Sequence, residues 1–172
     1  DAVNFTHALF HYKKKTKDWY DIIYWSNILD IDIAKEKEKE INMDRISLKD
    51  GSLDVLDKLK AQGKKLFLIT NAHRITLNIK LKKYNISKYF DEMICSHELG
   101  YIKEDIQLWH ILRLKLKLDY KHSVLIEDTF DNINSAYHAG LNNFVYISKN
   151  KKFISPLSPL IVESFGEISS RI

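Results

Sequence analysis

The feature that most constrains the fold is an alternation between short apolar runs and stretches with helical periodicity, which begins near Leu48. The apolar runs, each of strand length, are residues 65–69, 90–95, 123–126 and 143–147. The helical stretches are residues 52–63, 72–84, 104–118, 130–139 and 162–172. Strands that alternate with helices are typical of right-handed crossover units, in which successive strands lie parallel. The sequence therefore predicts an α/β fold built on a parallel sheet.

The N-terminal part of the chain has a different pattern. Apolar and aromatic residues recur at three-to-four spacing from Ala2 to Ile41, with no apolar run of strand length, and Asp18 is a candidate N-cap. We therefore predict two parts, a helical segment over residues 1–46 and an α/β part over residues 47–172.

Composition excludes several classes of protein. The sequence has 172 residues, of which 45% are hydrophobic, so it can bury a core. The single cysteine, Cys95, excludes an internal disulfide and a multi-cysteine metal cluster, and makes a cytoplasmic location the default expectation. The lysines behind the net charge of +4 are dispersed among acidic residues, and no apolar run approaches the length of a membrane span. We expect neither a nucleic acid nor a membrane as partner.

An acidic pair follows the apolar run at residues 123–126. Glu127 and Asp128 come directly after this run, Thr129 can cap the next helix, and Gly140 can end it. Neighbouring carboxylates repel each other, so a site that keeps both ionised usually offers them a cation, and oxygen ligands suit Mg²⁺. The alternative is a solvated acidic turn at a helix N-terminus, which the helix dipole also favours.

Two other polar residues occupy comparable positions. Thr70 follows the run at residues 65–69, where its hydroxyl could bind a phosphate oxygen or simply cap a helix. Lys103 lies in the turn at residues 100–105, where it could neutralise an anionic substrate or be one more exposed lysine. Because the carboxyl ends of parallel strands meet at one edge of a sheet, the hydroxyl, the ammonium and the two carboxylates together predict a phosphate and magnesium site.

The order Thr, Lys, Glu-Asp resembles the haloacid dehalogenase superfamily of Mg²⁺-dependent phosphohydrolases. The segments similar to its second, third and fourth motifs are residues 66–71, 100–103 and 124–128. Further segments look like the GMP/IMP 5′-nucleotidase branch, namely residues 18–20, 24–26, 70–73, 100–105 and 108–110. The resemblance implies a Rossmannoid parallel sheet with helices on both faces and an N-terminal helical cap over residues 1–46.

The resemblance also implies roles for individual residues. Thr70 would hydrogen-bond the transferring phosphoryl group, Asn71 would steady the same loop, and His73 would face the substrate, as would the aromatic residues of the cap. Lys103 would offset the charge of nucleophile and phosphate. Glu127 and Asp128 would bind Mg²⁺, and Asn132 is a further candidate close to the metal. The implied substrate is a small phosphate ester, a purine nucleoside monophosphate in the nucleotidase branch.

The family's first motif, a strand that ends in Asp-x-Asp and supplies the attacking carboxylate, is absent from the sequence. Asp30-Ile-Asp32 has the right letters, but it lies in the helical segment, and we reject it as the nucleophile. We expect that Asp1 is not the natural start and that a further strand belongs between those ending at Thr70 and Asp128. We also expect no phosphatase turnover from the 172-residue chain itself.

Two other interpretations stay open. The chain could be a degenerate relative without catalysis that keeps a phosphate-binding or protein-binding surface. A phosphoacceptor receiver domain uses the same residue types, but it places the acidic pair near its start and its lysine last, the reverse of the order here.

Overall fold

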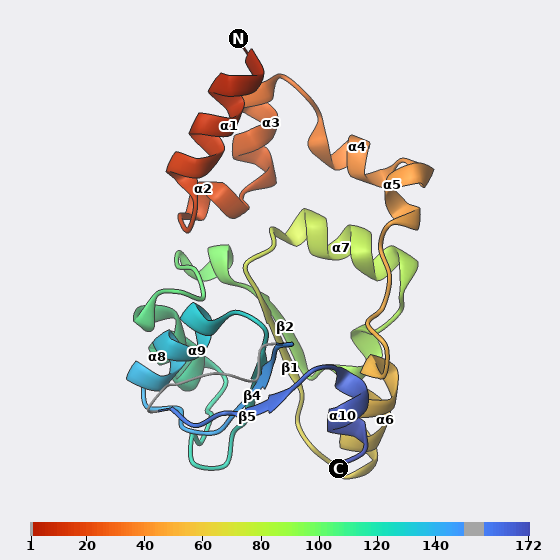
Figure 1. Ribbon diagram of the computed structural model, residues 1–172, viewed down its shortest axis with the longest axis vertical. Helices are drawn as coiled ribbons and strands as arrows, with labels where there is room; N and C mark the ends of the chain where they lie inside the picture. The colour runs from red at the N-terminus through yellow and green to blue at the C-terminus, as the bar shows by residue number, and fades with distance from the viewer. Residues whose placement is uncertain (1, 150–156) are drawn as a thin grey trace.

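The computed structural model describes residues 2–149 and 157–172, and Figure 1 shows their arrangement. Residues 2–44 form α1 (Ala2–Lys13), α2 (Lys17–Tyr20), α3 (Ile22–Leu29), α4 (Ile33–Glu38) and α5 (Glu40–Asp44). The following elements are α6 (Ser52–Ala61), β1 (Phe67–Thr70), α7 (Arg74–Lys83), η1 (Ser87–Tyr89), β2 (Glu92–Cys95), η2 (Ser96–Leu99) and α8 (Ile106–Lys115). The chain continues with β3 (Leu125–Glu127), α9 (Phe130–His138), β4 (Phe144–Ile147), β5 (Leu160–Val162) and α10 (Phe165–Ser169). Among the described helices, none is long and apolar enough to cross a bilayer.

All strand pairs in the described ranges are parallel, as predicted. β1 pairs with β2, with Phe67 opposite Glu92 and Thr70 opposite Cys95. β3 pairs with β4, and β4 pairs with β5. The prediction missed β5, whose last residue, Val162, was assigned to the final helix; that helix instead begins at Phe165.

The strands form two separate sheets, with orders β1-β2 and β3-β4-β5. Within residues 2–149 and 157–172, β1 has no hydrogen-bonded strand partner other than β2, and β3 none other than β4. Direct pairing of β1 with β3 would have argued against a vacant strand position between them, and this pairing does not occur. One edge of β1 and one edge of β3 therefore lack a strand neighbour among the described residues.

One hydrophobic core joins the two sheets. Ile94 from β2, Leu108 and Leu112 from α8, Ile133 from α9 and Phe144 from β4 belong to a single buried cluster. A smaller cluster joins α6, β5 and α10 through Val55, Val162 and Ile168. Side-chain packing therefore holds together sheets that share no backbone hydrogen bonds in the described structure.

The N-terminal segment is helical, as expected, but its helices are short. Asp21 ends α2 and accepts a hydrogen bond from Ile23 N at the start of α3, and Asp32 does the same for Lys35 N in α4. The prediction of Asp18 as an N-cap was wrong, because Asp18 lies inside α2 and Thr16 holds the N-cap position. Figure 1 shows α1, α2 and α3 together at one end of the molecule, with α4 and α5 beside α7.

The aromatic residues of this segment pack on one another. The Phe10 ring lies 5.5 Å from the rings of both Trp19 and Trp25, measured between centroids. Trp25 Nε1 also donates to Trp19 O at 3.1 Å. These contacts give both tryptophans a packing role inside the helical segment.

Candidate phosphate and magnesium site

The loop after β1 is ordered by its own side chains. Thr70 ends β1, and its Oγ1 accepts a hydrogen bond from Ala72 N at 3.0 Å, which turns the chain toward α7. Asn71 is only 6% exposed, and its Oδ1 accepts hydrogen bonds from Ser96 Oγ and Lys103 N, both at 2.8 Å. Asn71 therefore ties the end of β1 to the segment that carries Lys103.

Lys103 lies in the turn before α8. Gly100, at φ +81°, ends η2 in a left-handed conformation that suits glycine, and Ile102 N donates to Asp105 Oδ2 at 3.0 Å. Trp109 Nε1 donates to Lys103 O at 2.8 Å and fixes the backbone. The ammonium group then donates to Glu127 Oε2 at 2.6 Å. This bond bridges the two sheets, because Lys103 follows β2 and Glu127 ends β3.

Both oxygens of Glu127 have partners within the protein. Oε2 accepts the hydrogen bond from Lys103, and Oε1 accepts hydrogen bonds from Asp128 N and Thr129 N at 3.0 Å each. Burial alone would raise the pKa of Glu127, but the adjacent Lys103 ammonium and hydrogen bonds, including one from Asn132, hold the pKa below its ordinary value. Glu127 is therefore kept as a carboxylate, with its charge balanced by Lys103.

Asp128 is in the opposite electrostatic situation. Partial burial, and then the neighbouring Glu127 carboxylate, raise the pKa of Asp128. Thr129 Oγ1 donates to its Oδ1 at 3.5 Å, a long hydrogen bond. A cation at this position would relieve the repulsion between the two carboxylates.

A buried amide lies beside the acidic pair. Asn132 is 3% exposed and hydrogen-bonds Glu127, yet its Oδ1 has no hydrogen-bond partner in the described structure. The Asp128 carboxylate and Asn132 Oδ1 are oxygen ligands of the kind that Mg²⁺ prefers. Mg²⁺ typically takes one or two carboxylates together with water and substrate phosphate. No group of three His, Cys, Asp or Glu residues among the described residues could hold a metal ion. The donor set thus fits Mg²⁺ in kind, with ligands still to be supplied by water, substrate or a further carboxylate.

His73 faces the helical segment. It is the N-cap of α7, where its Nδ1 accepts from Ile75 N, and its ring stacks on His97 with centroids 4.3 Å apart. Its Nε2 lies 4.0 Å from Asp21 Oδ1. Burial, and then the neighbouring His73, lower the pKa of His97. His73, a predicted substrate-binding residue, therefore lies beside the N-terminal helices.

The rejected Asp30-Ile-Asp32 sequence is located in a turn between helices. Asp30 is the left-handed C-cap of α3, and Asp32 is the N-cap of α4. Both line an open groove of about 490 Å³ that also includes Ile75. Neither carboxylate follows a strand, which is where the attacking carboxylate of the first motif would lie.

Sequence reasoning missed two residues that complete the hydrogen-bond network. Glu104 Oε2 accepts a hydrogen bond from Asn71 Nδ2 at 2.8 Å, and Glu104 Oε1 accepts one from Tyr20 Oη at 2.5 Å. Both residues belong to segments with a resemblance to the nucleotidase branch. Their mutual contact had no signal in the sequence, since 84 positions separate them.

Comparison with known proteins identifies the family of this chain. Residues 6–146, most of the chain, match a family described as haloacid dehalogenase-like hydrolase. The chain belongs to this family of hydrolases. The resemblance inferred from its motifs is therefore confirmed. This hydrolase carries Thr70 at the end of β1, Lys103 in the turn between η2 and α8, and the Glu127-Asp128 pair at the end of β3.

The relatives of this hydrolase include phosphatases. GMP/IMP nucleotidase YrfG of Escherichia coli (strain K12) is 30% identical over 141 residues, which cover 82% of this chain and 63% of that protein. Pyrophosphatase PpaX of Bacillus velezensis is 25% identical over 87 residues, which cover 51% of this chain and 40% of that protein. The hydrolase chain thus spans less than two thirds of the length of either relative.

A solved structure supports the fold of this hydrolase. The crystal structure of a HAD phosphatase from Thermococcus onnurineus superposes with a TM-score of 0.80 at 18% sequence identity. The match covers 95% of this chain and 76% of that one. The α/β fold predicted from the sequence is therefore confirmed.

Proposed function

We propose that this hydrolase is a Mg²⁺-dependent phosphomonoesterase that acts on a purine nucleoside 5′-monophosphate. The observation that carries the proposal is one continuous hydrogen-bond network, which runs from Asn71 through Lys103 to Glu127. Thr70 directly precedes Asn71 in the sequence, and Asp128 directly follows Glu127. The nucleotide specificity is supported by the 30% identity to a GMP/IMP nucleotidase.

In this proposal, each residue acts on the phosphoryl group or on the charge around it. Thr70 Oγ1 donates to a phosphoryl oxygen. The hydrogen bonds of the Asn71 side chain hold the loop that follows Thr70 in place. Lys103 reduces the negative charge that nucleophile, phosphate and Glu127 bring together, and Glu127 holds the ammonium in place. Mg²⁺ would be held by Asp128, with Asn132 beside it. Glu127, the other predicted ligand, would act through water, because both its oxygens already accept hydrogen bonds. The bound ion would supply positive charge to the phosphoryl oxygens.

The nucleophile in the proposal is an aspartate on a strand between β1 and β3. Its carboxylate oxygen attacks phosphorus, the P–O ester bond breaks, and the leaving nucleoside oxygen takes a proton from a second aspartate, which is in its protonated carboxylic acid form. Water then cleaves the aspartyl phosphate and releases inorganic phosphate. The unpaired edges of β1 and β3 among the described residues support this placement, because a strand there would end beside Thr70 and Asp128.

The proposal includes a division of labour within the chain. Residues 1–46 act as a helical cap over the site, and residues 47–172 form the catalytic core. A cytoplasmic location is part of the same proposal, and the free, buried thiol of Cys95 is compatible with a reducing environment.

The test measures phosphate release from GMP and IMP, with and without EDTA. It compares the 172-residue chain with a version extended at its N-terminus by the corresponding Asp-x-Asp strand of a relative. We expect EDTA-sensitive release from the extended version, no release from the unextended chain, and loss of release after Lys103→Met in the extended version. Equal release with and without EDTA would refute the proposal.

A non-catalytic role as a phosphate-binding relative is the second candidate. It is supported by the network of Asn71, Lys103 and Glu127, which could hold a phosphate without a nucleophile. Phosphate binding by calorimetry, combined with no turnover from the extended version, would support this second function over the first.

A further inference from the structure

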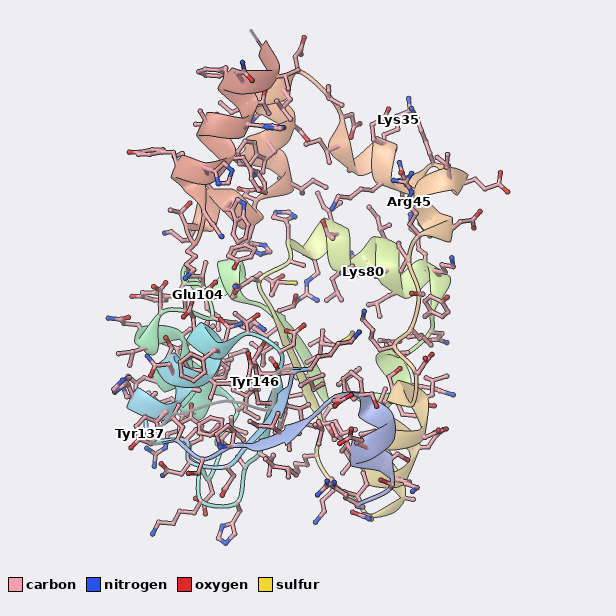
Figure 2. The ribbon with its side chains drawn as sticks, viewed as in Figure 1. Lys35, Arg45, Lys80, Glu104, Tyr137 and Tyr146 are labelled. Carbon is pink, nitrogen blue, oxygen red and sulfur yellow. The ribbon has the colours of Figure 1, made fainter. Side chains whose placement is uncertain are left out.

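A hydrogen bond between side chains joins the N-terminal helices to the loops of the proposed site. Tyr20, the last residue of α2, donates its hydroxyl hydrogen to Glu104 Oε1 at 2.5 Å. The other oxygen of Glu104 accepts from Asn71 Nδ2 at 2.8 Å. In Figure 2, the labelled Glu104 lies on the side of the core that faces the N-terminal helices.

Glu104 is held firmly between these two contacts. Its backbone carbonyl accepts a hydrogen bond from Ser135 Oγ in α9. Burial, and then the hydrogen bond to Glu104, raise the pKa of Tyr20, so its hydroxyl stays protonated and remains a donor at neutral pH. A change in the position of Tyr20 must therefore change the hydrogen bonding of Glu104.

The effect reaches Lys103 through Asn71. Asn71 is buried, and all its polar atoms are used: Nδ2 by Glu104, and Oδ1 by Ser96 and by Lys103 N. The Asn71 side chain is also in hydrogen-bonding contact with Tyr20 itself. Buried amides are costly to leave without partners, so the Asn71 side chain is expected to follow Glu104. The relay Tyr20–Glu104–Asn71 ends on the residue whose ammonium bonds Glu127.

We infer that Tyr20 and Glu104 form a latch through which the position of the N-terminal helices sets the geometry of Asn71 and Lys103. Glu104 is a positioning residue in this latch, since it acts through Asn71. The inference rests on the proposed function, because it assigns the latch to the same phosphate site. Displacement of α2 would then break the hydrogen bond between Tyr20 and Glu104 and loosen Asn71 and Lys103.

A second contact between the same parts of the molecule supplies a control. Lys15, in the loop after α1, forms an ion pair with Asp131 in the first turn of α9. Both side chains are about half exposed, at 54% and 47%, so the pair is well solvated. Lys15→Met removes this contact and a through-space attraction between Lys15 and Glu104, and it leaves both side-chain hydrogen bonds of Glu104 in place.

The experiment measures the affinity of the 172-residue chain for inorganic phosphate with Mg²⁺, by calorimetry, and the NMR resonances of the Asn71 side-chain amide and the Lys103 backbone amide. The variants are Tyr20→Phe, Glu104→Ala, their double mutant, Glu104→Gln and Lys15→Met. Urea unfolding of each variant confirms that it is folded. Glu104→Gln retains an oxygen for Asn71 and serves as the conservative replacement.

Tyr20→Phe is expected to weaken phosphate binding on the order of fivefold, a typical coupling between distinct sites, and to shift both resonances. Glu104→Ala is expected to weaken binding at least as much, and the double mutant no more than Glu104→Ala alone. Glu104→Gln and Lys15→Met are expected to stay within about twofold of the wild type.

Three results would overturn the latch. These are unchanged Asn71 and Lys103 resonances in Tyr20→Phe, additive effects in the double mutant, and an equal effect of Lys15→Met. If the wild type binds no phosphate, the resonances alone decide the latch, since they need no ligand, and the phosphate-release assay on the extended version decides the proposed function. Shifted resonances would then support the latch, and unshifted ones would refute it.

Discussion

Removal of the Lys103 ammonium tests how the buried ion pair of the site is balanced. Lys103 Nζ lies 2.6 Å from Glu127 Oε2, and the two side chains are 15% and 5% exposed. Loss of one partner of a buried pair costs about 3–5 kcal/mol, because the other charge stays buried without compensation. We expect Lys103→Met to lower the free energy of unfolding by about 3 kcal/mol at pH 7. This value is at the lower end of the range because two backbone amides still donate hydrogen bonds to Glu127.

The pH dependence separates lost charge from lost packing. In the wild type the pKa of Glu127 is lowered, so the contribution of the pair is complete above the ordinary carboxyl pKa and is lost as pH falls through the lowered value. In the variant, burial acts on Glu127 without the ammonium, and the carboxylate binds a proton more readily. The deficit relative to the wild type should therefore shrink when the pH is lowered from about 7 to about 5.

The assay is urea unfolding at the two pH values, followed by circular dichroism. The matched control is Lys39→Met, which removes an ion pair of the same 2.6 Å length between Lys39 and Glu36, with side chains 55% and 44% exposed. The control should cost no more than about 1 kcal/mol. Equal losses for the two variants, or a deficit for Lys103→Met that does not change with pH, would refute the reasoning.

Three further predictions concern stability. The hydrogen bond from Arg74 is the main reason that the pKa of Glu98 is lowered. The stabilisation by this pair is therefore present above the ordinary carboxyl pKa and is lost as pH falls through the lowered pKa. Glu98→Gln should reduce the steepness of acid unfolding below about pH 4. Gly51 and Gly63 both have a left-handed backbone, in which a side chain costs roughly 1–2 kcal/mol of stability. Gly51→Ala would also place a Cβ 2.5 Å from the backbone nitrogen of Gly166 in α10, whereas the Cβ of Gly63→Ala meets nothing within 4 Å. Thermal unfolding should therefore show a stability loss above that backbone cost only for Gly51→Ala. Leu108→Ala, at a fully buried position, should cost about 2–5 kcal/mol in urea unfolding, and Leu114→Ala, 80% exposed on the same helix, less than about 0.5 kcal/mol.

Much of the α/β part could be predicted because its elements have local signals. The apolar runs at residues 65–69 and 123–126 lie within two positions of β1 and β3, and Gly140 follows α9 at φ +99° as its C-terminal signal required. β5 was missed because no polar motif follows it and it gains its place by pairing with β4, whereas β3, which is equally short, is followed by the acidic pair that drew attention to it. The breaks between the N-terminal helices were missed because continuous periodicity hid the capping aspartates Asp21 and Asp32.

The candidate site was partly predictable for a different reason. Parallel topology brings strand ends together, so Thr70, Lys103 and Asp128 could be grouped before any coordinates. The detailed partners could not, because Tyr20 and Glu104 are far apart in the sequence and meet only in the folded chain. The pairing of Glu127 with Lys103 likewise depends on the exact reach of two side chains across the break between sheets.

The break between the sheets has a consequence for behaviour in concentrated solution. Strand edges without neighbours present peptide groups that can pair with any extended polypeptide. In the described structure β1 and β3 each have such an edge, and a common hydrophobic core holds the edges near each other. The chain is therefore expected to form reversible oligomers by edge-to-edge strand pairing as its concentration rises. A short peptide that pairs with these edges of β1 and β3 should dissociate the oligomers.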